Sequence, residues 1–195
     1  MTNSPFRDAI WTLPTLARTE LPELAAGCGD QLAPAFAATI DRVFITGCGD
    51  SHHAGVAASL AFQQFSGLQF VSAMPAMRFA RYQASFLPVP DGGRSLVIGI
   101  SISGEVSRTV EALELAALGG AKTLAVTANP GGSLTRAAEL TLLLSPAPAT
   151  DVPEGMVLPG SSSYITSLLA LFQIALRLGL SRGRLTETAW LGHQR

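Results

Sequence analysis

The chain has 195 residues, and its 13 Lys or Arg and 14 Asp or Glu side chains give a formal net charge of −1. Hydrophobic residues make up 48% of the chain and charged residues 14%, which is enough apolar surface for a folded core and excludes an intrinsically disordered chain. Because no positive charge accumulates, we expect no broad binding to the phosphate backbone of DNA or RNA.

Three further features bear on the compartment. The longest apolar stretches, such as residues 165–176, are shorter than the roughly 20 residues that cross a bilayer, so no membrane span is expected. Charged side chains such as Arg7 and Asp8 interrupt the N-terminal residues, which argues against a secretory signal. The two cysteines, Cys28 and Cys48, are too few for a disulfide framework. We therefore expect a cytoplasmic protein.

The length predicts one domain over residues 1–195. Within it we expect an amphipathic helical segment at 1–40, an α/β core at 41–180 and a polar tail at 181–195. The candidate core positions of the first segment are its apolar residues Ile10, Leu13, Leu16, Leu21 and Leu24.

From residue 41 onward, short apolar runs alternate with helical segments, as in parallel strands joined by helical crossovers. Strands are predicted at 43–46, 69–73, 95–100, 123–127 and 140–144. Helices are predicted at 52–65, from Pro75 through Tyr82, from Val106 to Ala117, at 133–138 and at 164–178. The fold class is therefore α/β, with a doubly wound, flavodoxin-like five-stranded parallel sheet in the order 2-1-3-4-5 and helices on both faces.

Local signals refine these elements. We expect Pro75 in the first turn of its helix. A buried stripe is expected along Val106, Val110, Leu113 and Ala117, because they recur at helical spacing. A proline-rich stretch at 145–159 breaks regular structure, and the serines at 161–163 are expected to cap the helix that follows.

The chemistry is expected where the winding direction reverses, outside the carboxyl ends of the first and third strands. The two loops that follow these strands, residues 47–51 and 101–105, are rich in glycine and serine. Both precede helices, whose first N–H groups and positive dipole ends attract anions. The hydroxyl groups of Ser51, Ser101 and Ser103 add donors. This pattern predicts a site for a small phosphorylated metabolite.

Other interpretations of the two loops stay open. Their glycines are also explained by turn geometry alone, and their serines by helix capping. A nucleotide triphosphate is disfavoured because the chain lacks a Gly-Lys-Ser/Thr loop. A dinucleotide-binding reductase is a weaker alternative, because His52 stands where the third glycine of that fingerprint belongs and Gln69 where an acidic residue belongs.

The catalytic group is unknown from the sequence, and the candidates are one histidine and three carboxylates. His53 is a candidate for ring opening or proton transfer, while Glu105 and Glu154 are candidate carboxylates; Asp151 has the same status as Glu154. Each has a structural explanation as well, as a helix-terminal or surface residue. Cys48 and the two histidines lack the spacing of a zinc site, so we expect no metal and no cofactor.

The two loops resemble those of the sugar isomerase (SIS) domain family, and most of all the first SIS domain of glucosamine-6-phosphate synthase. Residues 47–55, Gly-Cys-Gly-Asp-Ser-His-His-Ala-Gly, are similar to Gly-Cys-Gly-Thr-Ser-Tyr-His-Ala-Gly, and residues 101–105, Ser-Ile-Ser-Gly-Glu, to Ser-Gln-Ser-Gly-Glu. The helix that follows residue 160 is also similar. The resemblance implies a three-layer SIS sandwich that holds a sugar phosphate. The implied substrate-binding residues are Gly49, Ser51, Ser101, Ser103, Gly104, Ser107, Ser161 and Ser162.

Three departures from the family pattern weaken the implied phosphate contacts. Asp50 stands in place of a threonine and adds a negative charge, while Ile102 replaces a glutamine and Val106 a threonine, leaving Ser107 as a substitute donor. The isomerising residues of the synthase lie in its second SIS domain or C-terminal tail and have no counterpart here.

The resemblance implies a phosphosugar-binding protein of carbohydrate-derivative metabolism, with an aldose–ketose or aminosugar phosphate isomerase as the expected activity. The alternative is a non-catalytic phosphosugar sensor or regulatory module. Because paired SIS halves share their sites in two-domain relatives, the resemblance also implies a homodimer or a higher homo-oligomer.

Overall fold

The computed structural model describes residues 4–87, 94–146 and 160–193. Its centre is a sheet of five parallel strands in the order β2-β1-β3-β4-β5. The strands are β1 (Ile40–Gly47), β2 (Phe70–Pro75), β3 (Arg94–Ile100), β4 (Lys122–Thr127) and β5 (Leu140–Leu143). The predicted doubly wound sheet and its strand order are confirmed.

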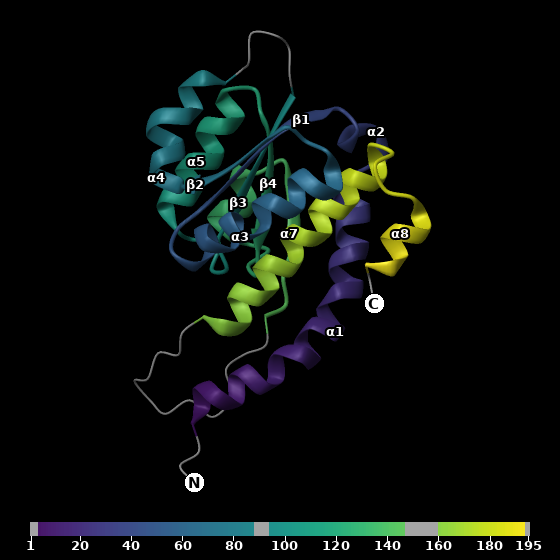
Figure 1. The fold of residues 1–195 in the computed structure, drawn as a ribbon. Helices are drawn as coiled ribbons and strands as arrows, with labels where there is room; N and C mark the ends of the chain where they lie inside the picture. The colour runs from purple at the N-terminus through teal and green to yellow at the C-terminus, as the bar shows by residue number, and fades with distance from the viewer. Residues whose placement is uncertain (1–3, 88–93, 147–159, 194–195) are drawn as a thin grey trace.

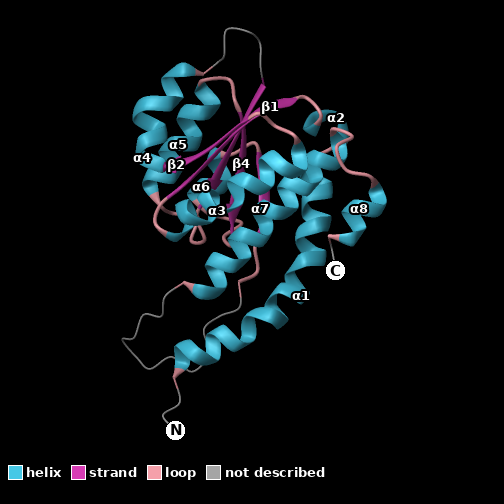
Figure 2. Cartoon of the chain, in the orientation of Figure 1, coloured by secondary structure: helices cyan, strands magenta, loops and turns pink. Residues whose placement is uncertain are grey.

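Helices cover both faces of this sheet, which makes the predicted three-layer sandwich (Figures 1 and 2). One face carries α1 (Pro5–Gln31), α3 (Asp50–Ser66) and α7 (Ser161–Ser181). The other carries α4 (Ala76–Arg78), α5 (Ser107–Leu118) and α6 (Ser133–Ala137). Two short helices, α2 (Pro34–Ala37) and α8 (Glu187–Gly192), complete the α-helices of the described residues.

The strands bury apolar side chains on both faces because they lie between two helical layers. Val43 and Ile45 pack beneath α3 and α7, whereas Phe44, between them in the sequence, packs toward α4 and α5. The alternation of side chains along a strand therefore explains why the strand segments form nearly continuous apolar runs.

The helix α7 is longer than predicted. By length and composition it is apolar enough to cross a membrane, but just over half of its apolar window is buried inside the protein. It packs against α1 and α3 and buries residues such as Leu171 and Ile174. Its apolar character is thus accounted for by its position in the core.

Some expectations about α4, the turns that follow it and α5 were wrong. Pro75 ends β2 and precedes α4 instead of lying in a helical turn. The predicted helix through Tyr82 is α4 followed by a π-helical turn (Phe79–Gln83) and a 3-10 turn (Ala84–Phe86). In α5 the buried face is Thr109, Ala112, Leu113 and Ala116, whereas Val106 and Ala117 are exposed. Val106 is the N-cap of the helix, and the buried Thr109 and Ala116 each lie one residue before the expected Val110 and Ala117.

The ends of the chain also differ from expectation. Ile10 is exposed, because the first half of α1 extends past the sheet and the buried residues of this helix begin at Leu16 (Figure 1). The segment expected to be a polar tail contains α8, whose first turn is capped by the side chain of Thr186. Gly160, not a serine, is the N-cap of α7, so the serine cluster lies inside its first turn.

Candidate functional site

The turn from β1 to α3 is compressed against the neighbouring strand. A Cβ atom on Gly47 would lie 2.8 Å from the Cβ atom of Ser51 and 3.0 Å from the carbonyl oxygen of Ile100. Only glycine allows α3 to begin this close to the ends of β1 and β3. Gly49, the N-cap of α3, has φ of 55°, which glycine adopts without a side-chain clash.

The turn from β3 to α5 is held by hydrogen bonds to β4 and the segment after it. The Ser101 N–H donates to the carbonyl of Val126 at 3.1 Å, and the Leu134 N–H donates to the carbonyl of Gly104 at 2.8 Å. The amide nitrogen Nδ2 of Asn129 donates to the carbonyl of Ser103 at 2.9 Å. Ser101 itself is buried, so its side chain belongs to the interior of this turn.

A cavity of about 240 Å³ opens where the turn from β1 to α3 (the first turn) meets the turn from β3 to α5 (the second turn) and the beginning of α7. Its lining residues come from all three segments: Cys48, Asp50, Ser51, Ile102, Ser163, Tyr164 and Ser167. Since Gly47 and Ile100 are register partners of adjacent strands, the cavity lies at the predicted position, the carboxyl edge between β1 and β3.

Two helix N-termini supply the hydrogen-bond donors of this cavity. Asp50 and Ser51 belong to the first turn of α3, and Ser163 and Tyr164 to the first turn of α7. The first N–H groups of a helix have no acceptor within it, and the dipole makes this end positive. The geometry is therefore suited to an anion.

The serine hydroxyls of the cavity differ in whether they already make a hydrogen bond within the protein. Ser163 Oγ donates to the carbonyl of Gly160 at 3.0 Å, and Ser167 Oγ donates to the carbonyl of Ser163 at 2.8 Å. Within the described residues, Ser51 Oγ has no hydrogen-bond partner. Ser51 is thus the serine of this lining whose hydroxyl can donate to a ligand without breaking a bond to another described residue.

Asp50 carries the only charge among the seven lining residues. Its Oδ2 atom lies 3.2 Å from the position that a Cβ atom would take on Gly160, the N-cap of α7. The carboxylate therefore faces the beginning of α7, where a negative charge is favoured.

Glu105, a candidate carboxylate from the sequence, is engaged elsewhere. It accepts hydrogen bonds from the N–H of Ser133 at 3.0 Å and from its Oγ at 2.6 Å. These bonds, aided by the nearby Arg136, hold the pKa of Glu105 below its usual value. Its carboxylate thus stabilises the beginning of α6 and does not line the cavity.

The other implied binding residues surround the cavity without lining it. Ser103 Oγ accepts the N–H of Glu105 at 3.3 Å and lies 3.4 Å from Ser101 Oγ. Ser107 is the exposed first residue of α5. The implied residues outside the lining are Gly49, Ser101, Ser103, Gly104, Ser107, Ser161 and Ser162.

The two histidines lie at the beginning of α3. The N–H of His53 donates to the carbonyl of Gly49 at 3.1 Å and closes the first turn, while its side chain is exposed. The ring centroids of His52 and His53 are 5.4 Å apart. Burial lowers the pKa of His52, and the neighbouring His53 lowers it further. Glu154 and Asp151 lie outside the described residues.

Sequence reasoning missed Ser163, Tyr164 and Ser167 as lining residues. The spacing of Ser163 and Ser167, four residues apart, places them on one face of a helix, but this signal required knowing that α7 begins before Tyr164. The predicted helix began at Tyr164, so the late start left Ser163 outside the helix and hid its spacing to Ser167.

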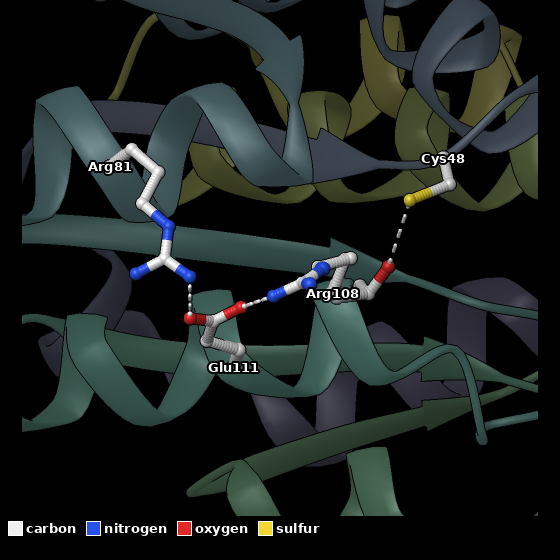
Figure 3. A network of polar contacts seen from close by, with 5 residues as sticks. Cys48, Arg81, Arg108 and Glu111 are labelled. Atoms are coloured by element: carbon white, nitrogen blue, oxygen red, sulfur yellow. Dashed lines mark hydrogen bonds and ion pairs between the residues drawn. The ribbon is translucent and has the colours of Figure 1, made fainter.

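Two arginines of the helical layer that contains α5, Arg81 and Arg108, are already paired with a carboxylate. Thr109 of α5 donates a long hydrogen bond, 3.9 Å, to the Sγ atom of Cys48. Its neighbour Arg108 is 2.8 Å from Glu111, which also binds Arg81 at 3.0 Å (Figure 3). Both guanidinium groups are thus directed to one carboxylate, and neither lines the cavity.

Comparison with known proteins identifies the family. The model of the SIS domain matches residues 38–177, which include every strand and the cavity. The chain belongs to the SIS domain family. Among the residues that the structure describes, no group of three or more His, Cys, Asp or Glu side chains is placed to hold a metal ion.

Curated relatives of this SIS domain are longer proteins. The chain is 32% identical over 149 residues to the isomerizing glutamine–fructose-6-phosphate aminotransferase of Caldanaerobacter subterraneus subsp. tengcongensis, an alignment that covers 76% of this chain and 22% of that protein. The chain thus spans about a fifth of the length of such relatives.

Solved structures share the fold of this SIS domain. The C-terminal domain of glucosamine-fructose-6-phosphate aminotransferase from Francisella tularensis has a TM-score of 0.75 at 18% identity, covering 99% of this chain and 52% of that one. The E. coli CFT073 protein c3406, solved in complex with A5P, has a TM-score of 0.69 at 16% identity and matches over the full length of both chains.

Proposed function

We propose that the chain binds a sugar phosphate in the 240 Å³ cavity beside the first turns of α3 and α7 and acts as a sugar-phosphate isomerase. The observation that carries this proposal is the meeting of two helix N-termini and the Ser51 hydroxyl, which no other described residue engages, at the carboxyl edge between β1 and β3. Free N–H groups and a hydroxyl at such a position suit a phosphate group.

Membership of the family supports the same ligand class. The relative with 32% identity is named for fructose 6-phosphate and for isomerization. The E. coli protein with the same fold over its full length was solved with A5P. We transfer the ligand class from these proteins to this chain as a proposal, without choosing a particular sugar.

Isomerisation needs a base that moves a proton between adjacent carbons, and a group that opens the sugar ring. Glu105 is an unsuitable base, because both of its carboxylate oxygens accept hydrogen bonds from Ser133. His53 and Glu154 remain the proposed candidates for proton transfer. A sensor or regulatory module is the second candidate function, favoured by the engagement of Glu105 and by the negative charge of Asp50 in the cavity.

Calorimetric titration tests the binding proposal. We expect fructose 6-phosphate to bind the wild-type chain, and Ser51→Ala to weaken it by about tenfold or more, because a hydrogen bond to a charged group is lost. The matched control is Ser59→Ala, in the same helix, whose hydroxyl donates to the carbonyl of Gly55 at 2.9 Å. NADH binding without sugar-phosphate binding would instead support a reductase.

Deuterium exchange separates the enzyme from the sensor. An isomerase incorporates solvent deuterium at the second carbon of the sugar phosphate, because the proton passes through an enediol. Binding without any incorporation at high protein concentration would support the sensor.

We propose that the chain functions in the cytoplasm as a homodimer or higher homo-oligomer. An open, mostly apolar cavity of about 440 Å³ lies between α3 and α7, with Leu60 and Phe172 among its lining residues. Leu60 is 69% exposed and belongs to this apolar lining, which suits an interface between protomers. Sedimentation velocity tests this: a single monomeric species at micromolar concentration would contradict it.

A further inference from the structure

We propose that Asp50 makes the cavity selective for a phosphorylated ligand that brings a cationic group beside its phosphate. The cation is either an amine on the ligand itself or a divalent metal ion bound to the phosphate. This inference rests on the proposed function and names a property of the ligand that the family pattern, with threonine at this position, does not require.

The argument begins with the charge of the cavity. Each helix N-terminus contributes roughly half a positive charge, and two of them, those of α3 and α7, border the cavity. The Asp50 carboxylate faces the beginning of α7, with Oδ2 3.2 Å from the Cβ position of Gly160. A full negative charge is therefore already placed against the two dipole ends, and it offsets them.

A phosphate monoester carries between one and a half and two negative charges at neutral pH, by analogy with phosphorylated side chains. None of the seven lining residues is a lysine or an arginine. Arg108, which precedes the Thr109 that donates to Cys48, is paired with Glu111. A phosphate that entered alone would therefore meet the Asp50 carboxylate with no side-chain cation to separate the two.

A cationic group between the phosphate and Asp50 removes this conflict. A ligand ammonium group can donate hydrogen bonds to the carboxylate. A magnesium ion is commonly held by one or two carboxylates together with phosphate oxygens of the substrate. Both sources give the same electrostatic result, so the experiment must separate them.

Calorimetric titration in three arms makes this test. The probes are fructose 6-phosphate in EDTA, fructose 6-phosphate with magnesium chloride, and glucosamine 6-phosphate in EDTA. We expect at least one cationic arm to bind the wild-type chain about tenfold more tightly than fructose 6-phosphate in EDTA. Tighter binding only with magnesium identifies the metal ion, and tighter binding only of glucosamine 6-phosphate identifies the amine.

Three variants complete the design. Asp50→Asn keeps the shape of the side chain, and Asp50→Thr restores the residue that the family pattern has at this position; in both we expect the preference to fall below about twofold and fructose 6-phosphate in EDTA to bind more tightly. Asp30→Asn, an exposed position near the end of α1, makes the same charge change away from the cavity and should keep the wild-type preference.

The outcomes distinguish failure of this inference from failure of the proposed function. Equal binding of all three probes to the wild-type chain, or a preference that survives in Asp50→Asn, overturns the inference and leaves the sugar-phosphate proposal standing. Failure of every probe to bind both the wild-type chain and the Asp50 variants overturns the proposed function, and the inference with it. Unchanged circular dichroism spectra of the variants show that each comparison is made between folded proteins.

Discussion

The two serine-bearing turns at the carboxyl edge of the sheet have similar sequences but different environments. In the turn before α3, Cys48, Asp50 and Ser51 face the cavity. In the turn before α5, only Ile102 lines it, and the polar groups of the turn bond to β4, Asn129 and α6. The first turn thus offers polar groups to a ligand, whereas the second uses its polar groups to hold the edge of the sheet together.

This difference shows that a glycine-serine loop at a strand end does not by itself identify a binding surface. What matters is whether its donors and acceptors are already satisfied within the protein. Ser51 and Ser103 illustrate the contrast, because Ser103 Oγ accepts the N–H of Glu105 at 3.3 Å while Ser51 has no partner in the described part of the chain.

The largest expected effect is a loss in the free energy of unfolding when a glycine of the second turn is replaced. Gly104 has φ of 69°, and a Cβ atom there would lie 3.1 Å from Thr127 Oγ1 and 3.2 Å from Asn129 Cβ. We expect Gly104→Ala to lower the free energy of unfolding by about 2–3 kcal/mol, from backbone strain and crowding together. Gly183→Ala, with φ of 68° and open space around its Cβ position, should cost only about 1 kcal/mol.

Urea unfolding of the two glycine variants measures this contrast. Equal losses in Gly183→Ala and Gly104→Ala would mean that the turn from β3 to α5 does not crowd a side chain at Gly104, and the account of this turn as tightly packed would fail.

The next effect concerns the residues of α7 that complete the cavity. Ser163 lines the cavity and Ser161 does not. We expect Ser163→Ala to weaken sugar-phosphate binding by about fivefold, because one donor or acceptor is lost. Ser161→Ala, the matched control in the same helical turn, should change the affinity by less than about twofold. Titration calorimetry with fructose 6-phosphate, in the presence of whichever cation supports binding, distinguishes the two variants. A larger loss of affinity in Ser161→Ala than in Ser163→Ala would mean that the ligand binds outside this cavity.

A smaller effect on stability is expected from Glu105→Gln, with no change in ligand affinity. The pKa of Glu105 is lowered by its hydrogen bonds to Ser133 and by Arg136, so its carboxylate stabilises the fold above the ordinary value of 4.5. This stabilisation is lost as the pH falls below 4.5 and through the lowered pKa. The gap in thermal midpoint between wild type and Glu105→Gln should therefore close in acid. A large loss of sugar-phosphate affinity in this variant would contradict its structural role.

The smallest expected effect is on the pH dependence of stability, through His52 at the beginning of α3. Burial lowers its pKa below the ordinary value of 6.5, so the unfolded chain binds a proton more readily than the folded one. Stability should therefore fall as the pH drops from 6.5 toward the lowered value, a window above that of Glu105. In His52→Gln, the slope of unfolding free energy against pH should flatten in this window alone. A slope that is unchanged would show that His52 does not titrate differently on folding.

Much of the fold was predictable because its signals are local and repeated. The alternation of apolar runs with helical segments predicted all five strands, and their order placed the two turns side by side. The predicted sites at Ser101 and Glu105 show the limit of this reasoning. Ser101 is buried through contact with β4, and Glu105 binds Ser133 across 28 residues of sequence, so both outcomes depend on packing between distant segments.

The start of α7 was the other limit. Three serines in a row indicate a helix cap, but a glycine took that position and moved the serines into the first turn. The position of one cap therefore decided which serine hydroxyls line the cavity, and neither propensity nor spacing distinguishes Gly160 from the serines after it as the cap.

A crystal structure of the chain with a bound sugar phosphate tests the central claim most directly. We expect the phosphorus atom beside the first turn of α3, with a phosphate oxygen within hydrogen-bond distance of Ser51 Oγ. A phosphate held at another cavity, or against the side chains of the second turn with the space beside Ser51 empty, would contradict the account.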